Sequence, residues 1–222
     1  MTGAALLLYI KRRLRLVGVN IPAASEEENA LMDYATEGRD TLLQVFAQRA
    51  PILVREYVTL EQDVADRSLF TFPAATKDPL KVLNLRAVTT RDPLIPSAAH
   101  LLDSDGGEYE WLTPRQVRVG EHVAPPGGLQ AAVVLVKDAI TTATTEPNIG
   151  VPIPTHRVLG KYGALLYATA DEDADGRILE QQYREELDRL IKLYAQYDNN
   201  GGEGLRQAFL HAFGEWQGDA LY

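Results

Sequence analysis

The fold is decided by Leu69-Phe-Thr-Phe-Pro73 and by four later runs: Leu80-Lys-Val-Leu-Asn-Leu-Arg86, Trp111-Leu-Thr-Pro-Arg-Gln-Val-Arg-Val119, Pro125-Pro-Gly-Gly128 and Ala132-Val-Val-Leu-Val136. Apolar and polar residues alternate in several of these runs, which is typical of half-buried strands. The last run is apolar throughout and predicts a strand buried on both faces. Together the runs predict a small antiparallel sheet or sandwich rather than alternating βαβ units. Because these strands carry few reactive side chains, they favour a scaffold or docking role.

Two helices are expected before this module. Residues 3–17 have apolar side chains at helical spacing. A second helix begins at a capping-box pattern formed by Ser25 and Glu28. Gly38 lies on the apolar stripe of that helix and predicts a close crossing with another helix. The following run, Leu53-Val-Arg-Glu-Tyr-Val-Thr-Leu60, is rich in β-forming residues and predicts a further strand.

Two more helices are expected after the module. A proline-rich connector at 146–154 leads to a helix over 155–170, and the longest helix covers 177–197. The long helix has an apolar seam at alternating spacings of four and three residues, which predicts packing against the preceding helix as a helical hairpin. The seam contains Leu179, Tyr183, Leu187, Leu190, Tyr194 and Tyr197.

The predicted fold class is α+β. Residues 1–51 supply the N-terminal helices of a helical bundle, and 146–198 supply the helical hairpin that completes it. Residues 52–145 form the inserted antiparallel β-module, and 199–222 form a flexible C-terminal docking arm.

Composition excludes several kinds of protein. The 222 residues contain no cysteine, so disulfides, thiolate metal sites and thiol nucleophiles are excluded. The formal net charge of −9 argues against tight DNA binding, which depends on lysine and arginine at phosphates. The apolar run Ala4-Ala-Leu-Leu-Leu-Tyr-Ile10 is too short to span a bilayer and precedes its basic residues, so neither a membrane span nor a signal peptide is expected.

Catalytic motifs are sparse. The four histidines are far apart in sequence, and neither a nucleophile elbow nor a phosphate-binding loop is present. We therefore expect no enzyme activity, no catalytic residue, no cofactor and no metal. A carboxylate-based cell-wall hydrolase stays open as an alternative, because catalytic carboxylates can be distant in sequence.

The acidic run Asp171-Glu-Asp-Ala-Asp-Gly176 has the ligand spacing of a calcium loop, with Asp171, Asp173 and Asp175 as the candidate ligands. Position twelve of such a loop should be a bidentate glutamate, but here it is Gln182. We interpret the run as an acidic turn between helices. A calcium-binding interaction module remains the alternative.

The C-terminal segment has aromatic and apolar residues on one helical stripe. A run rich in glycine and asparagine precedes it, which is what a docking arm needs. The predicted docking residues are Leu205, Phe209, Phe213, Trp216 and Tyr222. Packing of the rings on the chain's own core is the alternative.

The order of these elements resembles the head-to-tail adaptor (connector) proteins of tailed bacteriophages and gene transfer agents. The likeness covers about residues 3 to 197 and rests on the order and spacing of loose motifs. The motifs are the two N-terminal helices, the strand ending Leu69-Phe-Thr-Phe-Pro73, the hairpin Glu110-Trp-Leu-Thr-Pro-Arg-Gln-Val-Arg-Val119 with Pro125-Pro126, and the Pro152-Ile-Pro-Thr-His156 entry to a helical hairpin. The calcium-like turn and the lengthened tail depart from the family pattern, although several members carry C-terminal arms that reach the portal.

The resemblance implies a structural virion protein that forms a ring, expected to be twelve-fold, around the DNA exit channel at the head-tail interface or neck. It would assemble in the host bacterial cytoplasm. The implied partners are the portal protein, the next neck or tail protein (a stopper, nozzle or tail tube) and further copies of the chain. Double-stranded DNA would pass without sequence-specific binding.

Overall fold

The computed structural model describes residues 1–89, 91, 93–96, 108–120, 128–152, 154–170, 176–198 and 203–214, and for 147, 148, 170, 210 and 212–214 it describes the backbone alone. The chain forms two compact units. The helical unit contains Met1–Val54 and Lys137–Tyr222, and the β-unit contains Arg55–Val136. The fold is α+β, because a β-unit is inserted into a bundle of helices. Residues 52–54 and 137–145, expected in the β-module, belong to the helical unit.

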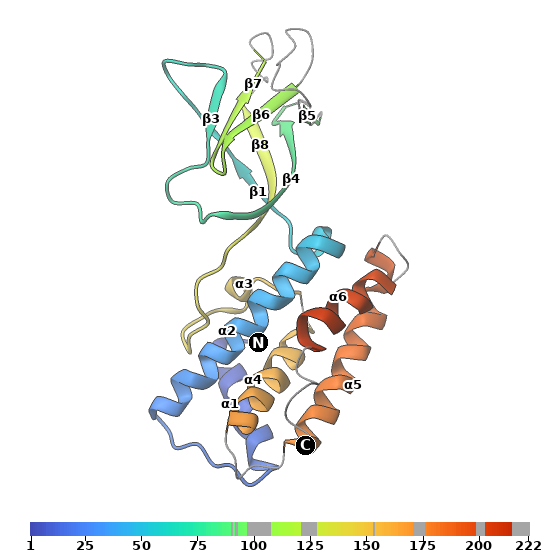
Figure 1. Cartoon of the computed structure of the whole chain (residues 1–222). Coiled ribbons are helices and arrows are strands. Elements are labelled where there is room, and N and C mark those ends of the chain that lie inside the picture. The colour runs from blue at the N-terminus through green and yellow to red at the C-terminus, as the bar shows by residue number, and fades with distance from the viewer. Residues whose placement is uncertain are drawn as a thin grey trace. The chain divides into compact units, whose positions relative to one another are not determined.

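The helical unit is made from both halves of the chain. Before the insertion lie α1 (Gly3–Arg15), α2 (Glu26–Arg49) and the 3₁₀ turn η1 (Pro51–Leu53). After it lie α3 (Glu146–Ile149), α4 (His156–Ala170), α5 (Arg177–Tyr194), η2 (Ala195–Tyr197) and α6 (Glu203–Gly214). Helix α4 packs against α1, α2 and α5, and α6 packs on α2 (Figure 1). The bundle therefore forms only when residues on both sides of the β-unit come together.

The start of α2 differs from the expected capping box. Ser25 is the N-cap residue, but its hydroxyl donates to the Pro22 carbonyl at 3.2 Å. The Glu28 carboxylate accepts the Ala24 amide at 2.9 Å and the Lys11 ammonium at 2.6 Å. The hydrogen bond from Lys11 lowers the pKa of Glu28. Glu28 thus connects α2 to α1 as well as closing the turn before α2.

Glycines set the helix crossings at α4. A Cβ atom on Gly38 of α2 would lie 2.6 Å from Cδ1 of Tyr162 on α4, which confirms the predicted close crossing. A Cβ atom on Gly160 of α4 would lie 2.3 Å from Cδ1 of Tyr9 on α1. Real Cβ atoms do not approach ring carbons this closely, so each aromatic ring occupies the space that a side chain would need.

The seam of α5 is confirmed except at its end. Leu179, Tyr183, Leu187, Leu190 and Tyr194 are all buried. Tyr197 is 42% exposed, so its assignment to the seam is wrong. The α-helix ends at Tyr194, and the tighter 3₁₀ turn of η2 changes the angular spacing of the side chains that follow.

Strands of the β-unit form two sheets among the described residues (Figure 1). One has the order β1-β8-β4, and the other has the order β2-β3-β7-β6-β5. The strands are β1 (Glu56–Thr59), β2 (Glu61–Gln62), β3 (Leu69–Thr71), β4 (Pro79–Ala87), β5 (Ile95–Pro96), β6 (Glu108–Thr113), β7 (Gln116–Val119) and β8 (Leu129–Leu135).

The sheets match the predicted module with two differences. Neighbouring strands are antiparallel, as expected, except that β5 pairs with β6 in parallel. The strand predicted from Leu53 is shorter, because Pro51–Leu53 form η1 and pairing begins at Glu56. Strand β8 is central in its sheet, and the run 131–134 is fully buried, as its composition predicted. Val136, the last residue of the predicted buried strand, lies beyond β8 and is 44% exposed, so its assignment is wrong.

The core of the β-unit is apolar and aromatic. It contains Leu60, Phe70, Phe72, Leu85, Leu94, Tyr109, Val117, Val119, Leu129, Ala131, Val133 and Leu135. Phe70 and Phe72 are nearly inaccessible to solvent, so both phenylalanines of the run Leu69-Phe-Thr-Phe-Pro73 are core residues of the β-unit.

The helix crossing at Gly38 can be tested by substitution. Gly38→Val should lower the free energy of unfolding by about 1–3 kcal/mol, because the new side chain overlaps the Tyr162 ring. Gln44→Val, at an exposed position of the same helix, controls for the helix propensity of valine and should cost less than about 0.5 kcal/mol. Urea denaturation measures both values. Equal losses in the two variants would refute a steric role for Gly38.

Candidate functional site

Helix α6 belongs to the core of the helical unit, which corrects the docking-arm prediction for Leu205 and Phe209. Both side chains are fully buried. The Phe209 ring meets Phe46 of α2 edge to face, with centroids 5.7 Å apart, and Phe46 meets Tyr194 of α5 at 5.5 Å. The Leu205 amide donates to the buried carboxylate of Asp198 at 2.8 Å. These contacts hold α6 on the chain's own bundle.

The physical reason for this correction is that the aromatic stripe of α6 has a matching surface within the unit. Phe46 lies near the C-terminal end of the apolar stripe of α2, and Tyr194 ends the seam of α5. Glycine is common in tight turns as well as in hinges, so a glycine-rich run does not by itself predict a mobile arm. The side chain of Phe213, and residues Trp216 and Tyr222, lie outside the described part of the structure.

The candidate calcium ligands Asp171, Asp173 and Asp175 also lie outside the described residues. Gln182, at position twelve of that loop pattern, lies on α5. Its Oε1 accepts Nη1 of Arg13 at 3.1 Å, and its carbonyl accepts Nζ of Lys161 at 3.0 Å. Gln182 therefore joins α5 to α1 and α4. Across the described side chains, no group of three or more histidine, aspartate or glutamate residues could hold a metal ion.

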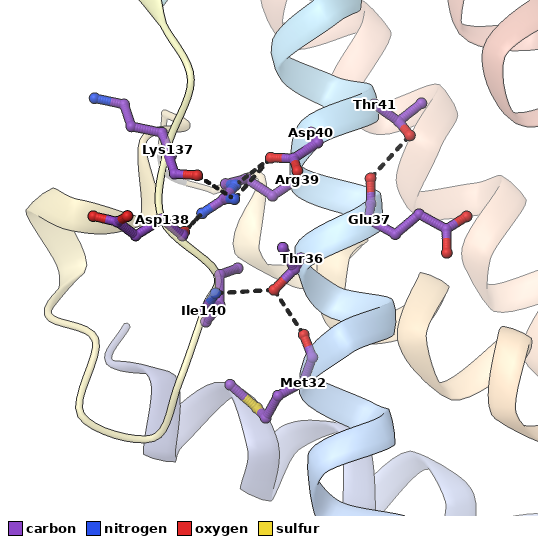
Figure 2. A network of polar contacts seen from close by, with 9 residues as sticks. All are labelled: Met32, Thr36, Glu37, Arg39, Asp40, Thr41, Lys137, Asp138 and Ile140. Atoms are coloured by element: carbon purple, nitrogen blue, oxygen red, sulfur yellow. Dashed lines mark hydrogen bonds and ion pairs between the residues drawn. The ribbon is translucent and has the colours of Figure 1, made fainter. Parts of the chain in front are cut away.

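A buried arginine on α2 binds the segment that returns from the β-unit (Figure 2). The Arg39 side chain is completely inaccessible to solvent. Its Nη1 donates to the Asp138 carbonyl at 2.6 Å, and its Nη2 approaches the Lys137 carbonyl at 3.4 Å. Its Nε donates to Oδ1 of Asp40 at 2.8 Å. The Asp40 carboxylate balances the charge of the guanidinium, whose N–H groups donate hydrogen bonds. These interactions offset the free energy lost when the guanidinium is removed from water.

One turn earlier, Thr36 extends the same contact. Its hydroxyl oxygen accepts the Ile140 amide at 2.9 Å and donates to the Met32 carbonyl at 2.9 Å (Figure 2). Residues 137–140 are thus bound to α2 by two polar side chains three residues apart on one face of the helix. We call Arg39, Thr36 and their partners in 137–140 the return clasp.

Sequence reasoning missed Arg39, although a signal was present. Arg39 follows Ala35 by four residues and precedes Leu42 by three, so it lies on the buried stripe of α2. A charged residue at such a position needs partners inside the protein. Apart from the adjacent Asp40, the partners could not be identified from the sequence, because they are backbone carbonyls about a hundred residues away in the chain.

The histidines differ in their surroundings. His156, at the start of α4, is 3% exposed, and its Nδ1 lies 3.9 Å from Oε1 of Glu146. Burial lowers the pKa of His156, which favours the neutral ring. Its Nε2 has no hydrogen-bond partner among the described residues. His211 is exposed on α6, whereas His100 and His122 lie outside the described residues.

Both units have apolar side chains at their surfaces. On the helical unit, Leu8 of α1 and Leu16, the residue that caps the C-terminal end of α1, are 56% and 58% exposed. On the β-unit, Val64 is 97% and Ile95 is 64% exposed. An open recess of about 440 Å³ on the β-unit is lined by Pro79, Leu80, Lys81, Val82, Trp111, Leu112, Thr113 and Pro114.

The packing of α6 can be tested at Phe209. Phe209→Ala should lower the free energy of unfolding by about 3–5 kcal/mol, because it removes a fully buried ring from contact with Phe46. Gln207→Ala, at an exposed position of the same helix, is the matched control and should change stability by less than about 0.5 kcal/mol. Thermal unfolding followed by circular dichroism measures both. An unchanged melting temperature in Phe209→Ala would restore the docking-arm interpretation.

Comparisons with known proteins identify no relative of this chain. No protein-family model matches the chain, and no curated protein matches its sequence. Within the described residues, no helix has both the length and the apolar character needed to cross a lipid bilayer.

Proposed function

We propose that this chain is a head-to-tail adaptor of a tailed bacteriophage or gene transfer agent. In this proposal it forms a ring, expected to be twelve-fold, that attaches to the portal vertex and surrounds the DNA exit channel in the neck of the virion. The ring binds the portal protein on one side and the next neck or tail protein on the other. Its role is structural, without catalysis or a cofactor.

The observation that carries the proposal is the arrangement of the chain around its insertion. Two N-terminal helices and a later pair of helices form one bundle, and an antiparallel β-unit lies between them in sequence. This is the element order on which the resemblance to adaptor proteins rests. A bundle with a separate inserted unit suits a component with different neighbours, since each unit can offer its own contact surface.

The surfaces supply a second line of support. The exposed side chains of Leu8 on α1 and Leu16 at its C-cap are two helical turns apart, and the exposed Arg12 lies between them in sequence. The recess on the β-unit is bordered by the partly exposed side chains of Leu80 and Leu112. Apolar groups gathered at a surface are typical of protein contacts. In a closed ring, weak contacts of this kind act together, so affinity for a symmetric portal rises steeply.

The charge of the chain is compatible with a channel for DNA. A formal net charge of −9 leaves an excess of acidic groups that repel phosphates. DNA that has to leave the capsid quickly needs a surface that does not bind it. We therefore expect weak DNA binding that disappears as the salt concentration approaches the physiological range.

Electron microscopy of the purified protein with purified portal rings of the same virus tests the proposal. We expect annular particles, either alone or on the portal, with one adaptor subunit for each portal subunit. Portal rings of an unrelated virus serve as the control and should remain bare. A protein that stays single-chain in sedimentation and leaves its own portal bare would rule out the adaptor function.

A further inference from the structure

The loop between β2 and β3 presents one apolar side chain on a well-ordered support. Val64 is 97% exposed, the largest exposed fraction among the large hydrophobic residues described. Oδ1 of Asp63 accepts the amides of Ala65 and Asp66 at 2.7 and 2.8 Å. Oδ1 of Asp66 accepts the amide and the hydroxyl of Ser68 at 3.0 and 2.5 Å. The loop extends away from the strands before β3 (Figure 1), and these hydrogen bonds favour one conformation of the backbone around Val64.

The recess on the same unit is equally well supported. Trp111 on its wall stacks on Phe72 of the core, with ring centroids 6.3 Å apart. Arg115 holds the segment that leads into β4, because its guanidinium donates to the carbonyls of Pro73 and Thr76 and to Oδ1 of Asp78 at 2.6–3.0 Å. A rigid apolar tip and a rigid apolar recess lose little conformational entropy when they associate.

The net charge around the recess favours an acidic segment as its occupant. Residues 61–67 contain three acidic residues and one basic residue, a net charge of −2. Arg118 lies 3.9 Å from Asp66 and offsets part of this charge. The segments that form and border the recess, 73–82 and 111–115, contain three basic residues and one acidic residue, a net charge of +2. The loop of one copy is therefore complementary in charge to the recess of another.

We propose that the Val64 loop of one copy of this chain binds in the recess between β4 and β6 of a second copy. The two surfaces are different parts of the β-unit, so the contact is heterologous and each copy can give one loop and receive another. This proposal rests on the proposed ring, for which it names a subunit contact. Because the chain contains no cysteine, introduced cysteines are its only thiols and can report the contact directly.

The experiment mixes two single variants that carry tags of different mass. Chains with Val64→Cys and chains with Leu112→Cys are combined and oxidised mildly, and non-reducing gels separate mixed from like pairs. The mixed disulfide should be the main product. Ile95→Cys replaces Leu112→Cys in the control, since Ile95 is exposed but does not line the recess, and its mixed product should stay at background. Absence of the first mixed product, or equal yields in both mixtures, would overturn the proposal.

Sedimentation of uncrosslinked variants separates this contact from the ring itself. Val64→Lys should weaken self-association by more than about tenfold, because it places a positive charge in an apolar recess that is itself bordered by basic residues, whereas Ile95→Lys should leave it unchanged. A ring that forms equally well with Val64→Lys would overturn the recess contact and leave the adaptor function standing. A mixed disulfide in an assembly of only two chains would support the contact and count against the ring.

Discussion

The hydrogen bonds of the buried Arg39 guanidinium join the two halves of the helical unit, because they attach α2 to the segment that follows the β-unit. The guanidinium binds the Asp138 carbonyl at 2.6 Å where the chain returns from the β-unit, and Thr36 binds the Ile140 amide one turn away. Removing one partner of a buried charge is strongly destabilising, commonly by about 3–5 kcal/mol. These hydrogen bonds therefore fix the segment 137–140 on α2 at the point where the chain re-enters the helical unit.

Helix α4 occupies the centre of the bundle because its neighbours can approach it closely. Gly38 makes room for Tyr162, and Gly160 makes room for Tyr9. These crossings join α1 and α2, from the first quarter of the chain, to a helix that begins at His156. The bundle depends on contacts between residues far apart in sequence, so we expect it to fold slowly for a helical protein of its size.

Periodicity predicted the helices and most strands, because buried faces repeat at spacings set by backbone geometry. It placed Gly38 at a helix crossing and 131–135 in a buried strand, but it wrongly included Val136, which is exposed. It failed where the local pattern has two physical solutions. The stripe containing Leu205 and Phe209 fits a partner protein or the chain's own bundle, and only the position of Phe46 and Tyr194 in space decides between them. The partners of Arg39 in 137–138 could not be predicted, because they are backbone carbonyls, which leave no sequence signal.

Each unit thus has a separate task in the adaptor proposal: the helices provide a stable body, and the β-unit offers a rigid loop and recess for a neighbouring copy. For the helical unit to form a stable body, the return clasp must hold residues 137–140 on α2. Hydrogen exchange at the Ile140 amide tests that requirement most directly. It should exchange as slowly as core amides of α2 in the native protein, and much faster in Arg39→Met, while β8 remains protected. Fast exchange at Ile140 in the native protein, or no change in the variant, would contradict the account.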